Sequence, residues 1–308
     1  WNKNAQINLP ADGFATYRLI VMTEGPPQQM ALLLPHISTS YHLWVNGKLL
    51  TSVGQVGPTA NEAAPAYAIR QVQFESRSGA NEILLQIANF SNLFGGVNSS
   101  IYLGTPEAIQ QLDRQKTARD ALLIGSLTIM AAYHFSLYLS RKKDRFTLQF
   151  GLLCLLVALR AAVTSQRYLL NLFPEMDWEW LTRLEYLTYY MAVPVFSQFI
   201  YSLYPTQAMK RYIRLLLPVC ALFSLFMLFT PVKVYGILSL AYDVLTLAGC
   251  ALVFYTLWQA RKQYYFQALL FTWGFLVLFL AVLNDLLQYK NLVHTPLLLP
   301  FGLLVFMF

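Results

Sequence analysis

The chain has 308 residues, of which 56% are hydrophobic and only 12% are charged, and its formal net charge is +7. Residues 1–118 hold seven Lys or Arg against seven Asp or Glu, whereas residues 119–308 hold fifteen against eight. The positive excess therefore lies in the apolar part, where it is typical of membrane-protein loops and does not indicate a nucleic-acid partner. Its three cysteines all fall in apolar stretches, and no metal-ligand spacing occurs, so we expect neither disulfides, nor a metal, nor another cofactor.

Residues 1–104 show the pattern of a β domain. Short apolar or alternating runs at 16–22, 30–34, 41–50, 68–74, 82–89 and 100–103 are separated by turn residues, and a helical period is almost absent. Asn46 and Gly47, set between two apolar runs, are the strongest short-range signal for a tight hairpin. The series predicts an antiparallel β-sandwich, for which about a hundred residues suffice.

Residues 105–118 are polar with helical tendencies, and we expect them to link the sandwich to the membrane. Apolar stretches follow at about 119–140, 146–165, 179–203, 212–230, 234–258, 264–286 and from 295 onward. Each is near the twenty residues that a helix needs to cross a bilayer, except the seventh, which we expect to be truncated at Phe308. The expected fold is β plus membrane α, with a sandwich at 1–104 and a seven-transmembrane helix bundle at 119–308.

Basic loops set the expected orientation of these helices. Nine of the cations after residue 119 fall in three short loops, at 141–145, 210–214 and 261–262. The positive-inside rule places such loops in the cytoplasm. We therefore expect the N-terminal domain to lie outside the cytoplasm and any continuation of the chain beyond Phe308 to lie inside it.

Several motifs resemble known families. The runs LWVNGKLL, GQVG and NEILLQIANF resemble the jelly-roll, galactose-binding-like modules of some glycosidases and bacterial receptors. The basic turn before FGLLCLLVALR, then LFPEMDWEWLTRLEYLTYY and FIYSLYP, resemble the bacterial seven-transmembrane receptors with diverse intracellular signalling modules (7TMR-DISM). The front domain resembles the second type of extracellular module in those receptors. The resemblance implies a carbohydrate or related small ligand and a cytoplasmic output module, such as a cyclase, kinase or phosphatase, after the seventh helix.

A carbohydrate site is a hypothesis for the β domain. Alternation along residues 41–45 places His42 and Trp44 on one face of a strand. A sugar site combines a flat aromatic ring with polar groups that bind hydroxyls. Trp44, His42, Arg70 and Asn89 are the expected ligand-binding residues. The alternative is that Trp44 is buried at a domain or dimer contact and that Arg70 is a solvated strand residue.

Four ionisable residues fall inside the expected spans, where charge is costly and often functional: Arg160, Glu185, Asp243 and Asp285. Counting along consecutive spans places Arg160 and Glu185 at similar depth, which favours an ion pair between them. One hypothesis is an outward-opening polar pocket. The simpler interpretation is a structural pair of Arg160 with Glu185, together with an Asp285 side chain that reaches the membrane surface. Asp243 fits that interpretation least well.

Three tyrosines, Tyr186, Tyr189 and Tyr190, form a stripe near the same level. Helical spacing of aromatic residues is more typical of packing than of a ligand cage. We therefore expect these tyrosines to pack between helices.

The combined features predict a sensory receptor of a bacterial inner membrane, with a periplasmic N-terminal domain and no enzyme activity within this chain. Its expected partners are a small ligand, the bilayer and a cytoplasmic signalling module, and a homodimer is left open. One alternative is a transporter with an accessory binding domain, although no internal repeat is visible. A second is a membrane-embedded glycan-modifying enzyme, whose catalytic acids would be Glu175, Asp177 or Glu179.

Overall fold

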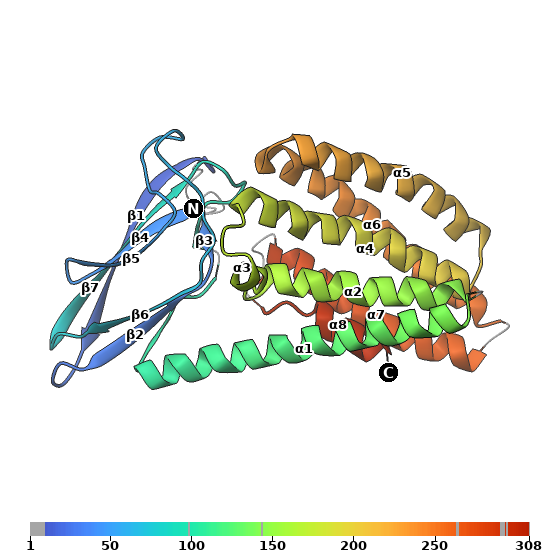
Figure 1. Ribbon diagram of the computed structural model, residues 1–308, viewed down its shortest axis with the longest axis horizontal. Helices are drawn as coiled ribbons and strands as arrows, with labels where there is room; N and C mark the ends of the chain where they lie inside the picture. Colours follow the sequence, from blue (N-terminus) through green and yellow to red (C-terminus); the bar gives the residue numbers. More distant parts are fainter. Residues whose placement is uncertain are drawn as a thin grey trace. The chain divides into compact units, whose positions relative to one another are not determined.

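The computed structural model describes residues 10–97, 99–142, 144–262, 265–289, 293 and 295–307 (Figure 1). Residues 1–9 of the expected sandwich and Lys143 of the first basic loop lie outside the described residues. The chain divides into two compact units. The first runs to Ala118 and includes Asp177–Glu179 and Pro231–Lys233, and the second holds the remaining, helical residues.

Two main antiparallel sheets form the β part of the first unit. The larger sheet has the strand order β1-β7-β4-β5, the smaller has the order β6-β2-β9, and β3 pairs with β8. The antiparallel pairing agrees with the sequence analysis, whereas the jelly-roll assignment stays a prediction. The strands are β1 Gly13–Thr23, β2 Gln29–Leu34, β3 Ile37–Ser38, β4 Ser40–Val45, β5 Lys48–Val53, β6 Arg70–Glu75, β7 Gly79–Asn89, β8 Gly96–Val97 and β9 Tyr102–Gly104.

The core between the sheets follows from the two-residue period of the strands. Tyr41, Leu43 and Val45 on β4 are all buried, as their alternation predicted, and they pack with Leu32 and Leu34 from the other sheet. The Tyr41 hydroxyl is buried with no hydrogen-bond partner among the described residues. Burial raises the pKa of the Tyr41 phenol to about 12.

The predicted hairpin joins β4 to β5. Asn46 and Gly47 both have positive φ, 52° and 82°, which is the conformation that a two-residue primed turn requires. The Asn46 side chain also accepts a hydrogen bond from the backbone N–H of Glu82 at 3.0 Å and donates one to Asn81 at 2.9 Å. This hairpin is therefore confirmed, and its turn is fastened to the neighbouring β7.

The helices are α1 Pro106–Ser140, α2 Arg145–Thr164, α3 Leu169–Leu172, α4 Trp178–Leu203, α5 Gln207–Phe229, α6 Val232–Ala260, α7 Tyr265–Tyr289 and α8 Leu299–Met307. Residues 106–118 of the expected linker form the beginning of α1. There Ile109 packs against Ala31 and Leu33 of β2. The polar segment is thus helical and partly anchored to the smaller sheet.

Among the described residues, five helices are long and apolar enough to cross a membrane: α1, α2, α5, α6 and α7. Helix α4 has 26 residues and is not one of the five. Helix α8 covers nine residues. Spans at α4 and α8, the expected third and seventh, therefore stay predictions.

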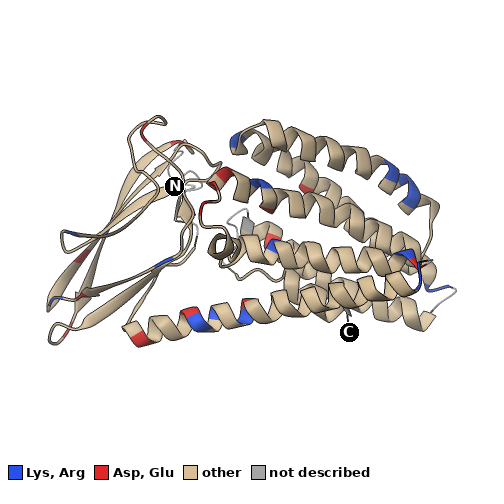
Figure 2. Cartoon of the chain, in the orientation of Figure 1, with Lys and Arg blue, Asp and Glu red and all other residues tan. Residues whose placement is uncertain are grey.

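Basic side chains mark one end of the helical unit. Figure 2 shows Lys and Arg gathered where α1 meets α2, at the start of α5 and at the end of α6. Helices α2 and α7 begin at that end and run away from it, whereas α4 and α6 run towards it. We call the opposite end of the bundle the acidic end, because three acids lie there. Glu175 and Asp177 precede α4, and Glu179 lies in its first turn.

Candidate functional site

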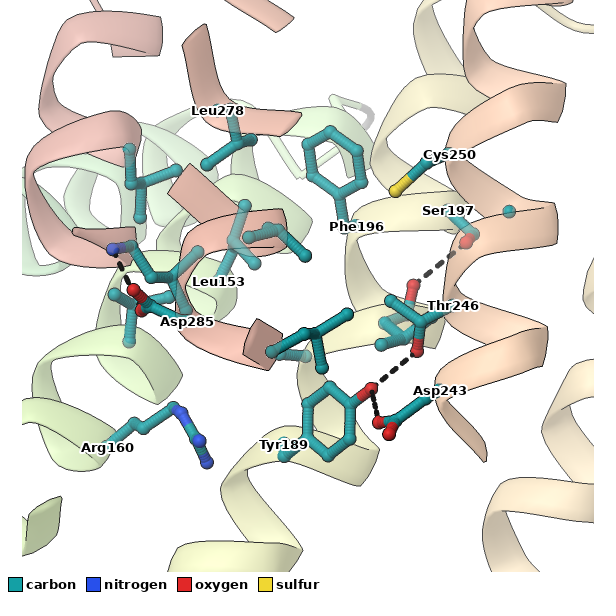
Figure 3. A pocket seen from close by; sticks show the side chains of 18 of the residues that line it. Leu153, Arg160, Tyr189, Phe196, Ser197, Asp243, Thr246, Cys250, Leu278 and Asp285 are labelled. Carbon is teal, nitrogen blue, oxygen red and sulfur yellow. Dashed lines mark hydrogen bonds between the residues drawn. The ribbon is translucent and has the colours of Figure 1, made fainter. Parts of the chain in front are cut away.

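One cavity brings together the four ionisable residues of the expected spans. Arg160 lies on α2, Glu185 on α4, Asp243 on α6 and Asp285 on α7, and all four line a cavity of about 130 Å³ (Figure 3). Each residue lies in the half of its helix nearer the acidic end. Helix α8 completes the wall through Leu299 and Leu303. The cavity is therefore polar on part of its surface and contacts five helices.

The expected ion pair between Arg160 and Glu185 is not formed. Arg160 Nη1 instead donates to the backbone carbonyl of Glu185 at 2.9 Å. Its guanidinium also lies over the ring of Tyr189, with 5.5 Å from Cζ to the ring centroid. The two helices do meet at the predicted depth, but the contact is a hydrogen bond to the backbone together with a cation–π contact.

The Glu185 carboxylate faces Arg167, a residue that the sequence analysis did not consider. Glu185 Oε2 lies 3.8 Å from Arg167 Nη2, and both side chains are largely buried. Arg167 follows the end of α2 with a φ of 52°, and its Nη1 donates back to the carbonyl of Val163 at 3.2 Å. The chain reverses direction at Arg167, so the Arg167 side chain points back towards α4. The ion-pair hypothesis was thus wrong in its partner, because depth counting along straight helices assigned Arg167 to a loop.

Tyr189 links two helices across the cavity. Its hydroxyl donates to Asp243 Oδ1 at 3.0 Å and lies 2.9 Å from Thr246 Oγ1, both on α6 (Figure 3). Asp243 is 5% exposed, so this hydrogen bond stabilises a carboxyl group well inside the bundle. The packing interpretation of the tyrosine stripe therefore omitted the polar role of Tyr189. The sequence did offer a signal for this contact. Tyr189 lies more than two turns into α4 and Asp243 lies within α6, so each places a polar group in an apolar segment.

A proline explains a second polar contact between the same helices. Pro194 inside α4 has no N–H, so the carbonyl of Tyr190, four residues earlier, has no helical donor. The Tyr242 hydroxyl donates to this carbonyl at 2.6 Å, and the Cys220 thiol donates to it at 3.1 Å. Helices α5 and α6 thus satisfy the group that the proline frees, which is how proline is accommodated in membrane helices.

Asp285 binds the beginning of α8. Its two carboxylate oxygens accept the backbone N–H groups of Leu298 at 2.7 Å and Leu299 at 3.0 Å, and Asn284 donates to it at 3.0 Å. The expectation that Asp285 reaches the membrane surface stays a prediction, but its carboxylate has partners within the protein, because free N–H groups at a helix start attract a carboxylate. Asp285 therefore fastens α7 to the start of α8.

The rest of the cavity wall is apolar. Phe196 on α4 stacks on Phe275 of α7, with ring centroids 5.6 Å apart and an interplanar angle of 17°. Leu278 and Val253 extend this wall. Figure 3 shows Arg160 at one side of the view and Phe196 and Leu278 at the other. The cavity thus has a charged part and an apolar part.

The four candidate residues of the β domain do not lie together. His42 and Trp44 share the outer face of the larger sheet, where His42 Nδ1 lies 2.7 Å from Ser52 Oγ. Arg70 begins β6 in the smaller sheet. Asn89 is fully buried and donates to the carbonyls of Ala11 and Asn92, both at 2.9 Å. A four-residue sugar site is therefore not assembled, because Asn89 has a structural role and Arg70 is on another sheet.

These features define a class: a membrane protein with several apolar helices, a polar cavity between them and an N-terminal β domain. The family of 7TM diverse intracellular signalling proteins, 7TMR-DISM, matches residues 116–308, which is more than half of the chain. The chain belongs to this family of membrane signalling receptors.

Solved structures share only a partial likeness with the chain. A GH2 beta-galacturonidase from Eisenbergiella tayi bound to galacturonate is 18% identical, with a TM-score of 0.24, over 30% of this chain and 17% of its own. An FMN-binding beta-glucuronidase from Facaelibacterium prausnitzii L2-6 is 14% identical, with a TM-score of 0.23, over 30% of this chain and 16% of its own. The chain thus spans less than a fifth of either enzyme. No curated protein matches the chain.

Proposed function

We propose that this chain senses a small extracytoplasmic ligand in the bundle cavity and transmits its binding through α8 to a cytoplasmic output module. The observation that carries the proposal is the composition of the cavity wall. Four charged side chains from four helices line it, and α8, which follows α7, contributes the fifth side. A ligand in this cavity touches the helix that leads towards any output module.

The orientation of the cavity supports an extracytoplasmic ligand. Under the positive-inside rule, the basic loops of Figure 2 face the cytoplasm. The cavity lies in the opposite half of the bundle, so its residues are nearer the outer surface of the membrane. In this arrangement the receptor lies in a bacterial inner membrane with its β domain in the periplasm.

Signalling requires that the ligand binds one arrangement of the helices more tightly than another. To move a two-state equilibrium from about 1:99 to 99:1, that difference in affinity must be about 10⁴-fold. A cavity shared by five helices suits this requirement, because a small displacement of α8 changes the contacts of a ligand with Leu299 and Leu303.

The rival functions receive less support. A transporter is expected to have helices broken near the midplane, whereas α4 and α5 continue through Pro194 and Pro218. For a membrane enzyme, Asp177 was a candidate acid, and its carboxylate accepts the backbone N–H of Glu179 at 2.8 Å at the start of α4. Asp177 is therefore explained as the N-terminal cap of α4, without a catalytic role.

A second candidate is glycan sensing by the outer face of the larger sheet. Trp44 supports it, because this half-buried aromatic residue shares the outer face of the larger sheet with His42. If a sugar stacks there, Trp44→Ala should weaken glycan binding by about 1–3 kcal/mol, by analogy with aromatic stacking on bases. An unchanged affinity for a glycan found by array screening would remove this candidate.

Spin-label distances test the proposed transmission. In a variant without the three native cysteines, labels on the exposed residues Val305 of α8 and Leu215 of α5 report the position of the last helix. Ala192→Leu adds a side chain to the cavity wall and imitates an occupied cavity. The Val305–Leu215 distance distribution should shift with Ala192→Leu, whereas a control pair on Leu139 of α1 and Leu215 should not. Identical Val305–Leu215 distributions in both proteins would contradict the proposal.

A further inference from the structure

We propose that the cavity binds a small carboxylic acid whose carboxylate pairs with Arg160 and whose apolar body is about the size of a benzene ring. The inference rests on the proposed function in one respect, namely that the cavity is a ligand site. It adds the chemical class of the ligand. Three features of the cavity point to this class: the unused donors of Arg160, the donors already bound to the three acids, and the size and polarity of the wall.

Arg160 has more donors than partners. A guanidinium carries five N–H donors and is always charged. Among the described residues, Arg160 donates one hydrogen bond, to the Glu185 carbonyl, and makes no ion pair with a carboxylate. A charge in this position inside a membrane protein is costly unless an anion accompanies it. A carboxylate ligand would supply two acceptor oxygens in the geometry that a guanidinium binds best.

The three acids of the cavity, unlike Arg160, already have hydrogen-bond or ion-pair partners in the protein. Glu185 faces Arg167, Asp285 accepts two backbone N–H groups at the start of α8, and Asp243 accepts the Tyr189 hydroxyl. By simple charge count, three carboxylates against one guanidinium would favour a cationic ligand. The contacts argue otherwise, because each acid already has a donor from the protein, whereas most donors of Arg160 have no acceptor.

The dimensions limit the ligand. An engineered apolar cavity of about 150 Å³ is large enough to bind benzene, and this cavity measures about 130 Å³. Phe196, Phe275 and Leu278 provide an apolar wall for such a body. A long acyl chain or a disaccharide exceeds this volume. Benzoate combines the required charge and size and is the probe of choice.

Binding is measured on the whole chain in nanodiscs of zwitterionic lipid, as the rise of the thermal midpoint Tm with ligand concentration. Benzoate should give a saturable rise. Benzamide and benzylamine, which have the same ring without the negative charge, should bind about 10- to 100-fold more weakly, the range expected for losing charged hydrogen bonds. A separate arm adds anionic lipid without benzoate, which distinguishes a lipid headgroup from a free acid.

Variants locate the site. Arg160→Gln should lower benzoate affinity about 10- to 100-fold, and Arg160→Lys, which keeps the charge without the fork, should lower it less. Arg145→Gln, on the same helix but exposed and outside the cavity, is the matched control and should bind benzoate normally. Ala192→Leu should also prevent binding by filling the cavity. It keeps the test decisive if Arg160→Gln does not fold.

Several outcomes overturn the inference. These are no saturable effect of benzoate, equal or tighter binding of benzamide or benzylamine, Arg160 variants with unchanged benzoate affinity, or an Arg160-dependent effect of anionic lipid alone. None of them bears on the spin-label distances. A failed ligand class is therefore distinguishable from a failed signalling function.

Discussion

The Tyr189 hydroxyl on α4 lies 3.0 Å from a carboxylate oxygen of Asp243 on α6, and Asp243 is 5% exposed. This hydrogen bond joins two helices that enclose the cavity. A buried carboxyl group is stabilised by hydrogen-bond donors, and Tyr189 supplies one. The bond therefore couples the stability of the bundle to the position of a residue that lines the cavity.

We expect Tyr189→Phe to lower the free energy of unfolding by about 1–3 kcal/mol, because it removes a donor from a buried acceptor. The measurement is thermal or denaturant unfolding of the purified chain. Tyr133→Phe, which changes an exposed tyrosine of α1, is the control and should have little effect. In an Asp243→Leu background the cost of Tyr189→Phe should shrink. An equal cost in both backgrounds would show that the two groups do not interact.

The partner of Glu185 can be identified by double-mutant cycles. Glu185→Leu and Arg167→Leu should each destabilise the protein by about 3 kcal/mol, the low end for a broken buried pair, because their contact is as long as 3.8 Å. The double variant should lose less than the sum. Arg160→Leu combined with Glu185→Leu should instead be additive, since Arg160 binds the backbone carbonyl of Glu185. Coupling in the second cycle and none in the first would reverse our assignment.

The carbonyl freed by Pro194 gives a third test. Tyr242→Phe should cost about 1–3 kcal/mol in the native sequence, because it removes the 2.6 Å hydrogen bond to the Tyr190 carbonyl. In a Pro194→Ala background that carbonyl regains an N–H from its own helix, so the same change should cost less. Unfolding of the four proteins in one detergent provides the comparison. No difference between the backgrounds would contradict the proposed role of Tyr242.

Asp285→Ala should loosen the start of α8. Loss of a helix-capping side chain costs about 0.5–2 kcal/mol, and the N–H groups of Leu298 and Leu299 should exchange faster with deuterium because their acceptor is gone. Asp285→Asn retains one acceptor oxygen and should lie between the native protein and the alanine variant. Unaltered exchange at α8 in the alanine variant would contradict the capping assignment.

Alkaline pH should destabilise the β domain through Tyr41. Burial raises the pKa of this phenol from 10.0 to about 12, so the folded state favours the protonated form. The resulting contribution of about 2–3 kcal/mol is fully present below about pH 10 and is lost as the pH rises through about 12. Tyr41→Phe should remove this dependence. At neutral pH it should be neutral or slightly stabilising, because the hydroxyl has no partner among the described residues. Calorimetric unfolding across this pH range checks it, and equally steep alkaline loss in both proteins would contradict it.

Local patterns predicted the parts of this structure that depend on neighbouring residues. The hairpin at Asn46 and Gly47 followed from turn chemistry, and the burial of Tyr41 and Leu43 followed from strand alternation. Charge in apolar segments singled out Arg160, although a structural ion pair was preferred there to the cavity that the residue lines. Each inference used a rule whose range is a few residues along the chain.

Side-chain partners could not be predicted in the same way, because they depend on distant contacts. Asn89 binds the carbonyl of Ala11, 78 positions away in the sequence. Arg167 reaches Glu185 only because the chain reverses at a positive φ after α2. The acceptor role of Asp285 likewise requires the start of α8 to lie beside the end of α7. A pattern of neighbouring residues in the sequence does not predict such contacts.

The clamp of Asp285 on Leu298 and Leu299 makes the start of α8 a pivot. Nine helical residues extend about 13 Å from it, so a tilt of about 10° displaces the far end by about 2 Å. Under the proposed function, a tilt of this kind would be passed on to the residues that follow this part of α8. A weaker clamp would let α8 tilt more freely, which under the proposed function would change how ligand binding is coupled to the far end of that helix.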